Sequence, residues 1–205
     1  MIIPQAKSCP IAASQNAVYS QFIQHLKVDP EKITRTTDIP FLPVSFFKTH
    51  KIVTPDGNDT QIVFSSSATT GTTQSQHFVH DLSVYEQSFI KGFEHFFGHV
   101  PDHCILALLP SYQEREGSSL IYMVDELIKL SGHPQSGYFL NDNEKLVRTL
   151  SDLRDKKQKT ILIGVTYALL DLAEEYKLDL ENIVIMETGG MKGRRKEMVR
   201  EELHD

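Results

Sequence analysis

From residue 82 onward, short apolar runs alternate with amphipathic stretches, and this alternation restricts the fold more than any other feature of the chain. The apolar runs lie at residues 104–109, 137–140, 160–165 and 182–187. The stretches whose apolar residues follow a helical spacing lie at residues 83–97, 118–131, 142–155 and 167–176. Continuous apolar strands separated by amphipathic helices are typical of a parallel sheet that is covered on both faces. We therefore expect an α/β fold with a mostly parallel sheet flanked by helices on both faces.

The first part of the chain lacks this alternation. Residues 13–28 carry apolar side chains near helical spacing and predict one amphipathic helix, whereas residues 36–60 form a connector rich in Pro and turn residues. Two short strands are expected next, at residues 61–64 and 76–79. The loop between them would therefore join two strands.

Length and charge restrict the organisation and the class of function. A chain of 205 residues is long enough for one well-packed core, so we expect one domain, with an N-terminal helix and connector (1–60) followed by an α/β core (61–205). Lys and Arg number 21 against 27 Asp and Glu, and the resulting net charge of −6 argues against a general nucleic-acid binder and a polybasic membrane anchor. No apolar run is long enough to span a bilayer.

The cysteine and histidine content does not predict a metal site. The two cysteines, Cys9 and Cys104, have no spacing that suggests a metal site or a disulfide framework, and a reducing cytoplasm fits this usage. His77 and His80 lack an acidic or cysteine partner at suitable spacing, so a structural role is favoured over metal binding. We therefore assign no metal ligands and expect a cytoplasmic protein.

A hydroxyl-dense loop lies between the two expected short strands. Residues 65–75 read Ser-Ser-Ser-Ala-Thr-Thr-Gly-Thr-Thr-Gln-Ser. Small residues let backbone N–H groups turn toward an anion, and each Ser or Thr adds a hydroxyl donor, so such a loop can hold phosphates without positive charge of its own. Runs of this composition are also common in ordinary surface loops. Composition alone leaves both interpretations open.

The order of residues within this loop favours the phosphate interpretation. Residues 66–71, Ser-Ser-Ala-Thr-Thr-Gly, resemble the Ser-Ser-Gly-Thr-Thr-Gly phosphate loop of the AMP-forming adenylating enzymes, which join a carboxylic acid to ATP to give an acyl-adenylate. Ala68 departs from this pattern, and residues 72–75 replace the Pro-Lys that commonly follows, so the loop supplies no lysine. Under this resemblance the β- and γ-phosphates of ATP are bound by Ser66, Ser67, Thr69, Thr70, Gly71 and Thr73.

Two further segments narrow the family. Residues 183–197, Ile-Val-Ile-Met-Glu-Thr-Gly-Gly-Met-Lys-Gly-Arg-Arg-Lys-Glu, resemble the signature of the acyl-protein synthetases of bacterial bioluminescence (LuxE-type), and residues 76–86 are also similar to that family. The resemblance covers residues 11–205. It implies the N-terminal-domain fold of an adenylate-forming enzyme, with ATP and Mg²⁺ as cofactors. It also implies that a fatty acid or other carboxylate becomes acyl-AMP and is passed to a thiol, either on a partner protein or on coenzyme A.

A glycine-rich turn follows the last expected strand. In parallel sheets ligands bind beyond the carboxyl ends of the strands, and glycines there let the backbone lie close to a flat ligand. We assign adenine or ribose binding to Thr188, Gly189, Gly190 and Met191, while an ordinary strand-to-helix turn is an equally good interpretation. Lys192 and Arg194 could contact the nucleotide, although charged residues in the first turn of a helix are more often solvated.

The loop after the strand at 104–109 lies on the same edge of the expected sheet. Ser111 and Tyr112 could line an acyl pocket there, whereas Ser118 or Ser119 is expected to cap the next helix. Neither Cys9 nor Cys104 matches the accepting cysteine of the family, and the catalytic residues are not assigned.

The resemblance also implies that this chain is incomplete. In the family a Tyr-Gly-x-Thr-Glu-type motif and a mobile C-terminal domain lie further on, and neither occurs in these 205 residues. We therefore expect a truncated, N-terminal portion of an enzyme, with a further helix at residues 195–204. The alternative is a non-catalytic nucleotide- or acyl-binding module. A third hypothesis for the function is a thiol-dependent acyltransferase without ATP chemistry, but the sequence has no G-x-S-x-G motif and shows no activated nucleophile.

Overall fold

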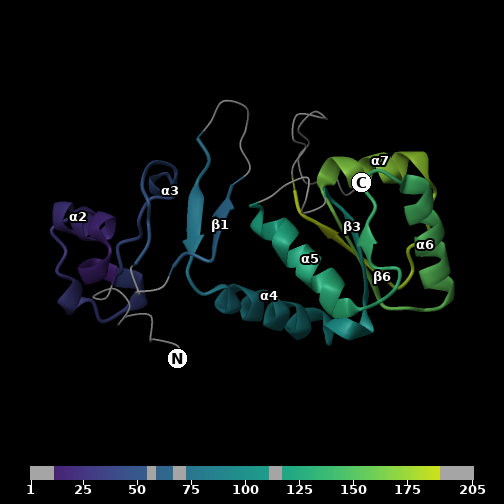
Figure 1. Cartoon of the computed structure of the whole chain (residues 1–205), viewed down its shortest axis with the longest axis horizontal. Coiled ribbons are helices and arrows are strands. Elements are labelled where there is room, and N and C mark those ends of the chain that lie inside the picture. The colour runs from purple at the N-terminus through teal and green to yellow at the C-terminus, as the bar shows by residue number, and fades with distance from the viewer. Residues whose placement is uncertain (1–11, 55–58, 67–72, 111–116, 190–205) are drawn as a thin grey trace. The chain divides into compact units, whose positions relative to one another are not determined.

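The computed structural model describes residues 12–54, 59–66, 73–110 and 117–189. By its backbone contacts the chain divides into two compact units, residues 1–83 and 84–205, and Figure 1 labels their helices and strands. The expected turn at residues 56–59 and the expected helix at 195–204 lie wholly or largely outside the described residues.

The first unit begins with a helix that is interrupted, where the sequence predicted one continuous helix over residues 13–28. Residues 12–15 are helical, Asn16 is extended, and α2 then spans Ala17–His25. The side chain of Asn16 explains the break, because its Oδ1 accepts a hydrogen bond from the N–H of Tyr19 at 3.0 Å and so caps α2. Its Nδ2 also donates to the carbonyl of Val53 at 3.1 Å.

In its described part, the connector after α2 contains only short elements. They are the 3₁₀ turns η1 (Pro30–Lys32) and η2 (Thr36–Asp38) and the one-turn helix α3 (Phe46–Thr49). A small apolar cluster forms around the buried side chains of Tyr19 and Ile23. The hydroxyl of Tyr19 donates to the carbonyl of Pro40 at 2.8 Å, which attaches the connector to α2.

The two strands expected at residues 61–64 and 76–79 are present, and they form an antiparallel hairpin. Strands β1 (Ile62–Ser65) and β2 (Gln76–Val79) pair from Ile62↔Val79 to Ser65↔Gln76. They form a two-stranded sheet that is separate from the parallel sheet of the second unit. The ring of His77, on β2, stacks on Phe47 at 4.8 Å between centroids, which is a structural role.

The second unit contains a four-stranded parallel sheet, which confirms the expected α/β arrangement. Its strands are β3 (Cys104–Leu108), β4 (Gly137–Tyr138), β5 (Thr160–Gly164) and β6 (Ile183–Glu187), in the order β4-β3-β5-β6. Each residue of β3 and β5 is buried, because these strands lie inside the sheet and are covered on both faces. At the edge, Val184 and Ile185 of β6 are 43% and 48% exposed.

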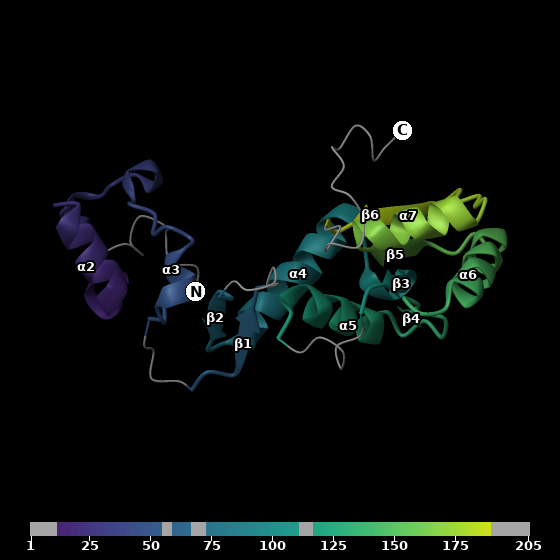
Figure 2. The same ribbon diagram turned by 90° about the horizontal axis from the view of Figure 1, so that it is seen from above.

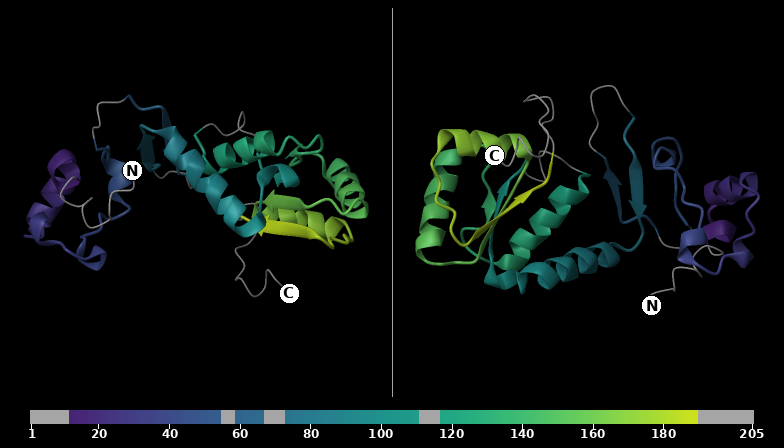
Figure 3. Two further views of the ribbon diagram at one scale, coloured as in Figure 1. Left: turned by 90° about the horizontal axis from the view of Figure 1, so that it is seen from below. Right: turned by 180° about the vertical axis from the view of Figure 1, so that it is seen from behind.

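Helices cover both faces of this sheet. Their bounds are α4 (Leu82–Phe97), α5 (Ser119–Ser131), α6 (Asn143–Asp155) and α7 (Thr166–Glu175), with a 3₁₀ turn η3 (Val100–Asp102) before β3. In Figure 2, α4 and α5 lie on one face of the sheet and α6 and α7 on the other, and Figure 3 shows the same two layers from the opposite side. Ser118 caps α5, as expected, by accepting from the N–H of Ile121 at 3.4 Å. Within the described part of the chain, every helix is too short or too polar to cross a bilayer.

Candidate functional site

The topology of the parallel sheet places a switch point between β3 and β5. From β3 the chain passes through α5 to β4, whereas from β5 it passes through α7 to β6 on the other side. The two connections therefore leave in opposite directions and on opposite faces of the sheet (Figure 2). In open α/β sheets ligands bind beyond the carboxyl ends of the strands at such a point. A ligand site is therefore expected at the loops after β3, β5 and β6.

The turn after β6 is attached to the end of β5 by two hydrogen bonds. The backbone N–H and the hydroxyl of Thr188 both donate to the carbonyl of Gly164, at 3.0 Å and 3.1 Å. These two hydrogen bonds anchor the backbone of Thr188 next to the neighbouring strand. Thr188 was predicted to contact the nucleotide, but its hydroxyl donates its hydrogen bond to the protein backbone.

Gly189 has a left-handed backbone, with a φ of +77°. This conformation is disfavoured for residues with a Cβ, which explains glycine here without any ligand. Among the described residues, a Cβ placed on Gly189 would have only Glu187 Oε1 within 4 Å, at 3.9 Å, so this part of the chain leaves the space beside it open. Open space against the backbone is also what a flat ligand requires.

Glu187, the last residue of β6, connects this turn to the start of α7. Its Oε1 accepts a hydrogen bond from the N–H of Gly189 at 2.6 Å and another from the hydroxyl of Thr166. Thr166 is 4% exposed and is the first residue of α7. The sequence alone does not indicate this role of Glu187, because Thr166 is 21 positions away and comes near only when β5 and β6 lie side by side.

The hydroxyl-dense loop is closed at its base by Ser66. The N–H of Ser66 donates to the carbonyl of Ser75 at 3.0 Å, and the N–H of Ser75 donates to the hydroxyl oxygen of Ser66 at 3.0 Å. An accepting hydroxyl still has its own proton to donate. Ser66 therefore has a structural role in the hairpin that the sequence did not indicate, and among the described residues nothing takes up the proton of its hydroxyl.

The remaining predicted site residues fall into two groups. Thr73 is described and is exposed. The others lie outside the described residues, and their assignments stay predictions: Ser67, Thr69, Thr70, Gly71, Ser111, Tyr112, Gly190, Met191, Lys192 and Arg194.

Comparison with models of protein families matches residues 12–202 to the family described as acyl-protein synthetase, LuxE. The chain belongs to the acyl-protein synthetase (LuxE) family. The match spans both the hydroxyl-dense loop and the segment after β6, and it confirms the family that these motifs predicted. Comparison with curated proteins found no match. Membership implies an acyl-protein synthetase, and therefore an enzyme with a carboxylate substrate and a protein acceptor.

Burial keeps Cys104 from serving as an acyl acceptor for such a synthetase. Cys104 is the first residue of β3 and is 0% exposed. The hydroxyl of Ser136 donates to its Sγ at 3.7 Å. Burial raises the pKa of the Cys104 thiol from 9.0 to about 11, with the Ser136 hydrogen bond opposing the shift. Because the thiolate is the nucleophilic form, Cys104 is inert at neutral pH.

An apolar cavity of about 210 Å³ lies between α7 and the strands β5 and β6 of this LuxE-family chain. Its lining residues are mostly aliphatic: Leu162, Thr166, Leu169, Leu170, Leu172, Ala173, Leu178, Leu180, Ile185 and Glu187. Thr166 and Glu187, the two polar lining residues, are the pair that fixes the turn after β6. Through Thr166 and Glu187 the cavity reaches the carboxyl edge of the sheet, whereas Leu178 and Leu180 precede β6 and lie toward its amino end. The sequence predicted an acyl pocket at the carboxyl edge from other residues.

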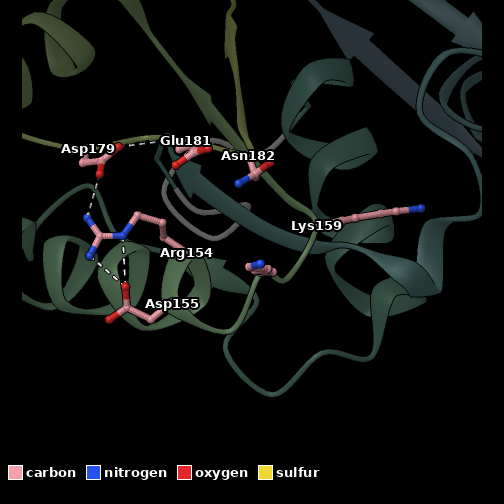
Figure 4. Close-up of a pocket in the computed structure, with 7 residues that line it drawn as sticks. Arg154, Asp155, Lys159, Asp179, Glu181 and Asn182 are labelled. Carbon is pink, nitrogen blue, oxygen red and sulfur yellow. Dashed lines mark hydrogen bonds and ion pairs between the residues drawn. The ribbon is translucent and has the colours of Figure 1, made fainter.

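A larger hollow of about 670 Å³ lies at the opposite, amino ends of β5 and β6 (Figure 4). Arg154 pairs there with Asp155 at 2.8 Å and with Asp179 at 3.3 Å. Three cationic and three acidic side chains line it, so its charges offset one another. Position and charge both make this hollow a poor site for a nucleotide.

Among the described residues, no three His, Cys, Asp or Glu side chains are grouped so that they could hold a metal ion.

Proposed function

We propose that this chain carries the nucleotide-binding part of an enzyme that activates a fatty or other carboxylic acid with ATP. A carboxylate oxygen attacks the α-phosphorus of ATP and pyrophosphate leaves, which gives acyl-AMP. A thiol sulfur then attacks the acyl carbon, AMP leaves, and the thiol proton passes to solvent. The observation that carries this proposal is the acyl-protein synthetase match over residues 12–202, which includes both predicted nucleotide motifs.

In this proposal the hydroxyl-dense loop binds the β- and γ-phosphates. In a phosphoryl-type displacement the protein mainly positions the reactants and offsets developing negative charge, and hydroxyl and amide donors can do both. The hairpin supports this role, since Ser66 and Ser75 hold the two ends of the loop together. A hydrogen bond to a charged group contributes about 1.5 to 3 kcal/mol, so loss of one donor should weaken ATP binding about tenfold to a hundredfold.

The turn after β6 binds adenine or ribose in the same proposal, through Thr188, Gly189, Gly190 and Met191, with Lys192 and Arg194 near the nucleotide. The space that the described residues leave beside Gly189 fits a flat ligand. Mg²⁺ in nucleotide sites is usually held by one or two carboxylates together with the phosphates and water. It therefore needs no cluster of protein ligands, and when bound it would neutralise phosphate charge.

Exchange of labelled pyrophosphate into ATP, dependent on a fatty acid, tests the proposal in the protein that contains this chain. We expect Thr69→Ala combined with Thr70→Ala to abolish exchange while the melting temperature stays nearly unchanged. The matched control is Thr37→Ala, an exposed threonine of η2, which should leave exchange unaltered. Unaltered exchange in the double variant would remove the loop from the mechanism.

A second measurement separates the activity from simple binding. ATP or acyl-AMP binding without any exchange would instead assign a non-catalytic nucleotide- or acyl-binding module. Gly190→Val should raise the ATP dissociation constant far more than it lowers the melting temperature. Normal ATP binding by this variant would leave the turn with a structural role alone.

A further inference from the structure

We infer that Glu187 is a positioning residue, which holds the turn at Thr188-Gly189 in the conformation that receives the nucleotide. The inference rests on the proposed function, because it takes the turn to be a nucleotide site. It goes beyond that function by assigning the control of the turn to a carboxylate that lies before the glycines.

The geometry around Glu187 carries this inference. A single carboxylate oxygen, Oε1, accepts from the N–H of Gly189 at 2.6 Å and from the hydroxyl of Thr166. The first bond closes the turn on itself. The second bond joins the turn to α7, which follows the neighbouring strand β5.

The other half of this arrangement is the pair of bonds from Thr188 to the carbonyl of Gly164. Thr188 is therefore fixed to the end of β5, and Gly189 is fixed through Glu187 to the start of α7. These bonds hold the peptide that precedes the φ of +77°, so they restrict the conformations open to Gly189 and favour the left-handed one. Glycine alone permits that conformation but does not select it.

A carboxylate suits this position for an additional physical reason. The residue before α7 is Val165, which has no side-chain acceptor for the first N–H groups of the helix, and no side-chain cap bond forms there. A negative charge near a helix N-terminus is stabilised by the helix dipole. The hydroxyl of Thr166, which is almost fully buried, brings the Glu187 carboxylate to that end of α7.

The negative charge of Glu187 also argues against direct phosphate contact. A carboxylate repels phosphate, and its Oε1 is already occupied by two donors. Glu187 therefore acts on the nucleotide through the N–H and the backbone direction of Gly189. A neutral side chain that keeps the acceptor oxygen should still hold Gly189, although it loses the attraction between the charge and the helix dipole, and this makes glutamine the informative substitution.

Two measurements on the protein that contains this chain test the inference. The first is the hydrogen-exchange rate of the Gly189 amide, which reports the clamp without reference to ATP. We expect Glu187→Ala to accelerate this exchange at least about tenfold, because the amide loses the acceptor that lies 2.6 Å from it. Glu187→Gln should stay within about threefold of the wild-type rate.

The second measurement is the dissociation constant of ATP in the same variants. We expect Glu187→Ala to raise it about tenfold and Glu187→Gln to restore it, since one hydrogen bond to a charged group corresponds to about that factor. Thr166→Val should produce part of the same increase, and Thr166→Ser should reverse it. The matched control is Glu181→Ala. It removes an exposed carboxylate that lies two residues before the amino end of β6, and it should change neither measurement.

Each contrary outcome has a distinct meaning. Unchanged Gly189 exchange in Glu187→Ala would overturn the inference whatever happens to ATP. Faster exchange with an unchanged ATP constant would also overturn it, because the fixed turn would then not serve the nucleotide. If the wild-type protein binds no ATP, the proposed function fails, and the exchange data still report whether Glu187 fixes the turn.

Discussion

At the scale of single residues, burial decides the chemistry of Cys104. The pKa of its thiol is raised to about 11 in the folded chain, because a thiolate inside β3 would have no solvent. In the unfolded chain the thiol ionises near its ordinary value of 9.0. Folding therefore depends on pH in the interval between these two values.

The sign of that dependence follows from proton binding. Between about pH 9 and pH 11 the folded state binds the thiol proton more tightly than the unfolded state, so the free energy of unfolding falls as pH rises. A difference of about two pKa units corresponds to at most about 3 kcal/mol. We expect Cys104→Ala to flatten this part of the curve, as measured by urea unfolding at pH 8 to 11. An identical slope in the variant would contradict the buried, protonated thiol.

Gly189 provides a second prediction at this scale. A residue with a Cβ at a φ of +77° is strained by about 1 to 2 kcal/mol. Gly189→Ala should lower the free energy of unfolding by about that amount, whereas Gly189→Asn should cost less, because Asn tolerates the left-handed region. Chemical denaturation of the two variants measures the difference. Equal stability of Gly189→Ala and wild type would mean that the turn adopts another backbone conformation in solution.

At the scale of elements, Ser66 connects the hairpin to its loop. Its hydroxyl accepts from the N–H of Ser75 directly beyond the Ser65↔Gln76 pair, so it extends the ladder by one side-chain bond. Ser66→Ala should expose the Ser75 amide and increase its hydrogen-exchange rate several-fold, while Ser66→Thr should preserve it. Nuclear magnetic resonance or mass spectrometry can measure both rates. If Ser66→Ala leaves the amide protected, the loop is closed by other bonds.

The strands and helices of the second unit could be predicted because local pattern and tertiary burial agree there. The sequence segments that form β3 and β5 are almost entirely apolar, since both faces of these strands are covered.

The spacing of apolar residues did not predict the structure where a single side chain determines the backbone conformation. Asn16 ends the first helical turns by capping α2, and an apolar spacing count cannot detect that bond. The strand expected at 137–140 is reduced to Gly137–Tyr138 for a similar local reason, because the chain turns at Asp142, whose N–H donates to the carbonyl of Phe139.

The candidate site could be predicted only in part. The sequence indicated the glycine turn and the hydroxyl-dense loop, because their residue types are unusual along the chain. It did not indicate the pairing of Glu187 with Thr166, which are 21 positions apart and meet only when β5 and β6 are neighbours. The cavity under α7 was missed for the same reason, since its aliphatic side chains look like ordinary core residues.

At the scale of the whole molecule, the two units differ in the size of their apolar cores. The cluster of the first unit is built around Tyr19 and Ile23, whereas that of the second includes the fully buried strands β3 and β5. Since burial of apolar surface is the main stabilising term, we expect the first unit to open at lower denaturant concentration. Native-state hydrogen exchange should then show faster exchange in α2 than in β3 and β5. A single shared opening energy for both units would contradict this expectation.

The edge position of β6 determines how this part of the protein should behave in solution. Among the described residues β6 is the last strand of its sheet, and Val184 and Ile185 are almost half exposed on it. A strand of this kind has backbone N–H and C=O groups free on one side, so a second extended segment can pair with it. Neither a proline nor a lysine occurs within Ile183–Glu187 to prevent such pairing. Where nothing else covers β6, concentrated samples will therefore tend to self-associate through this strand before the fold itself is lost.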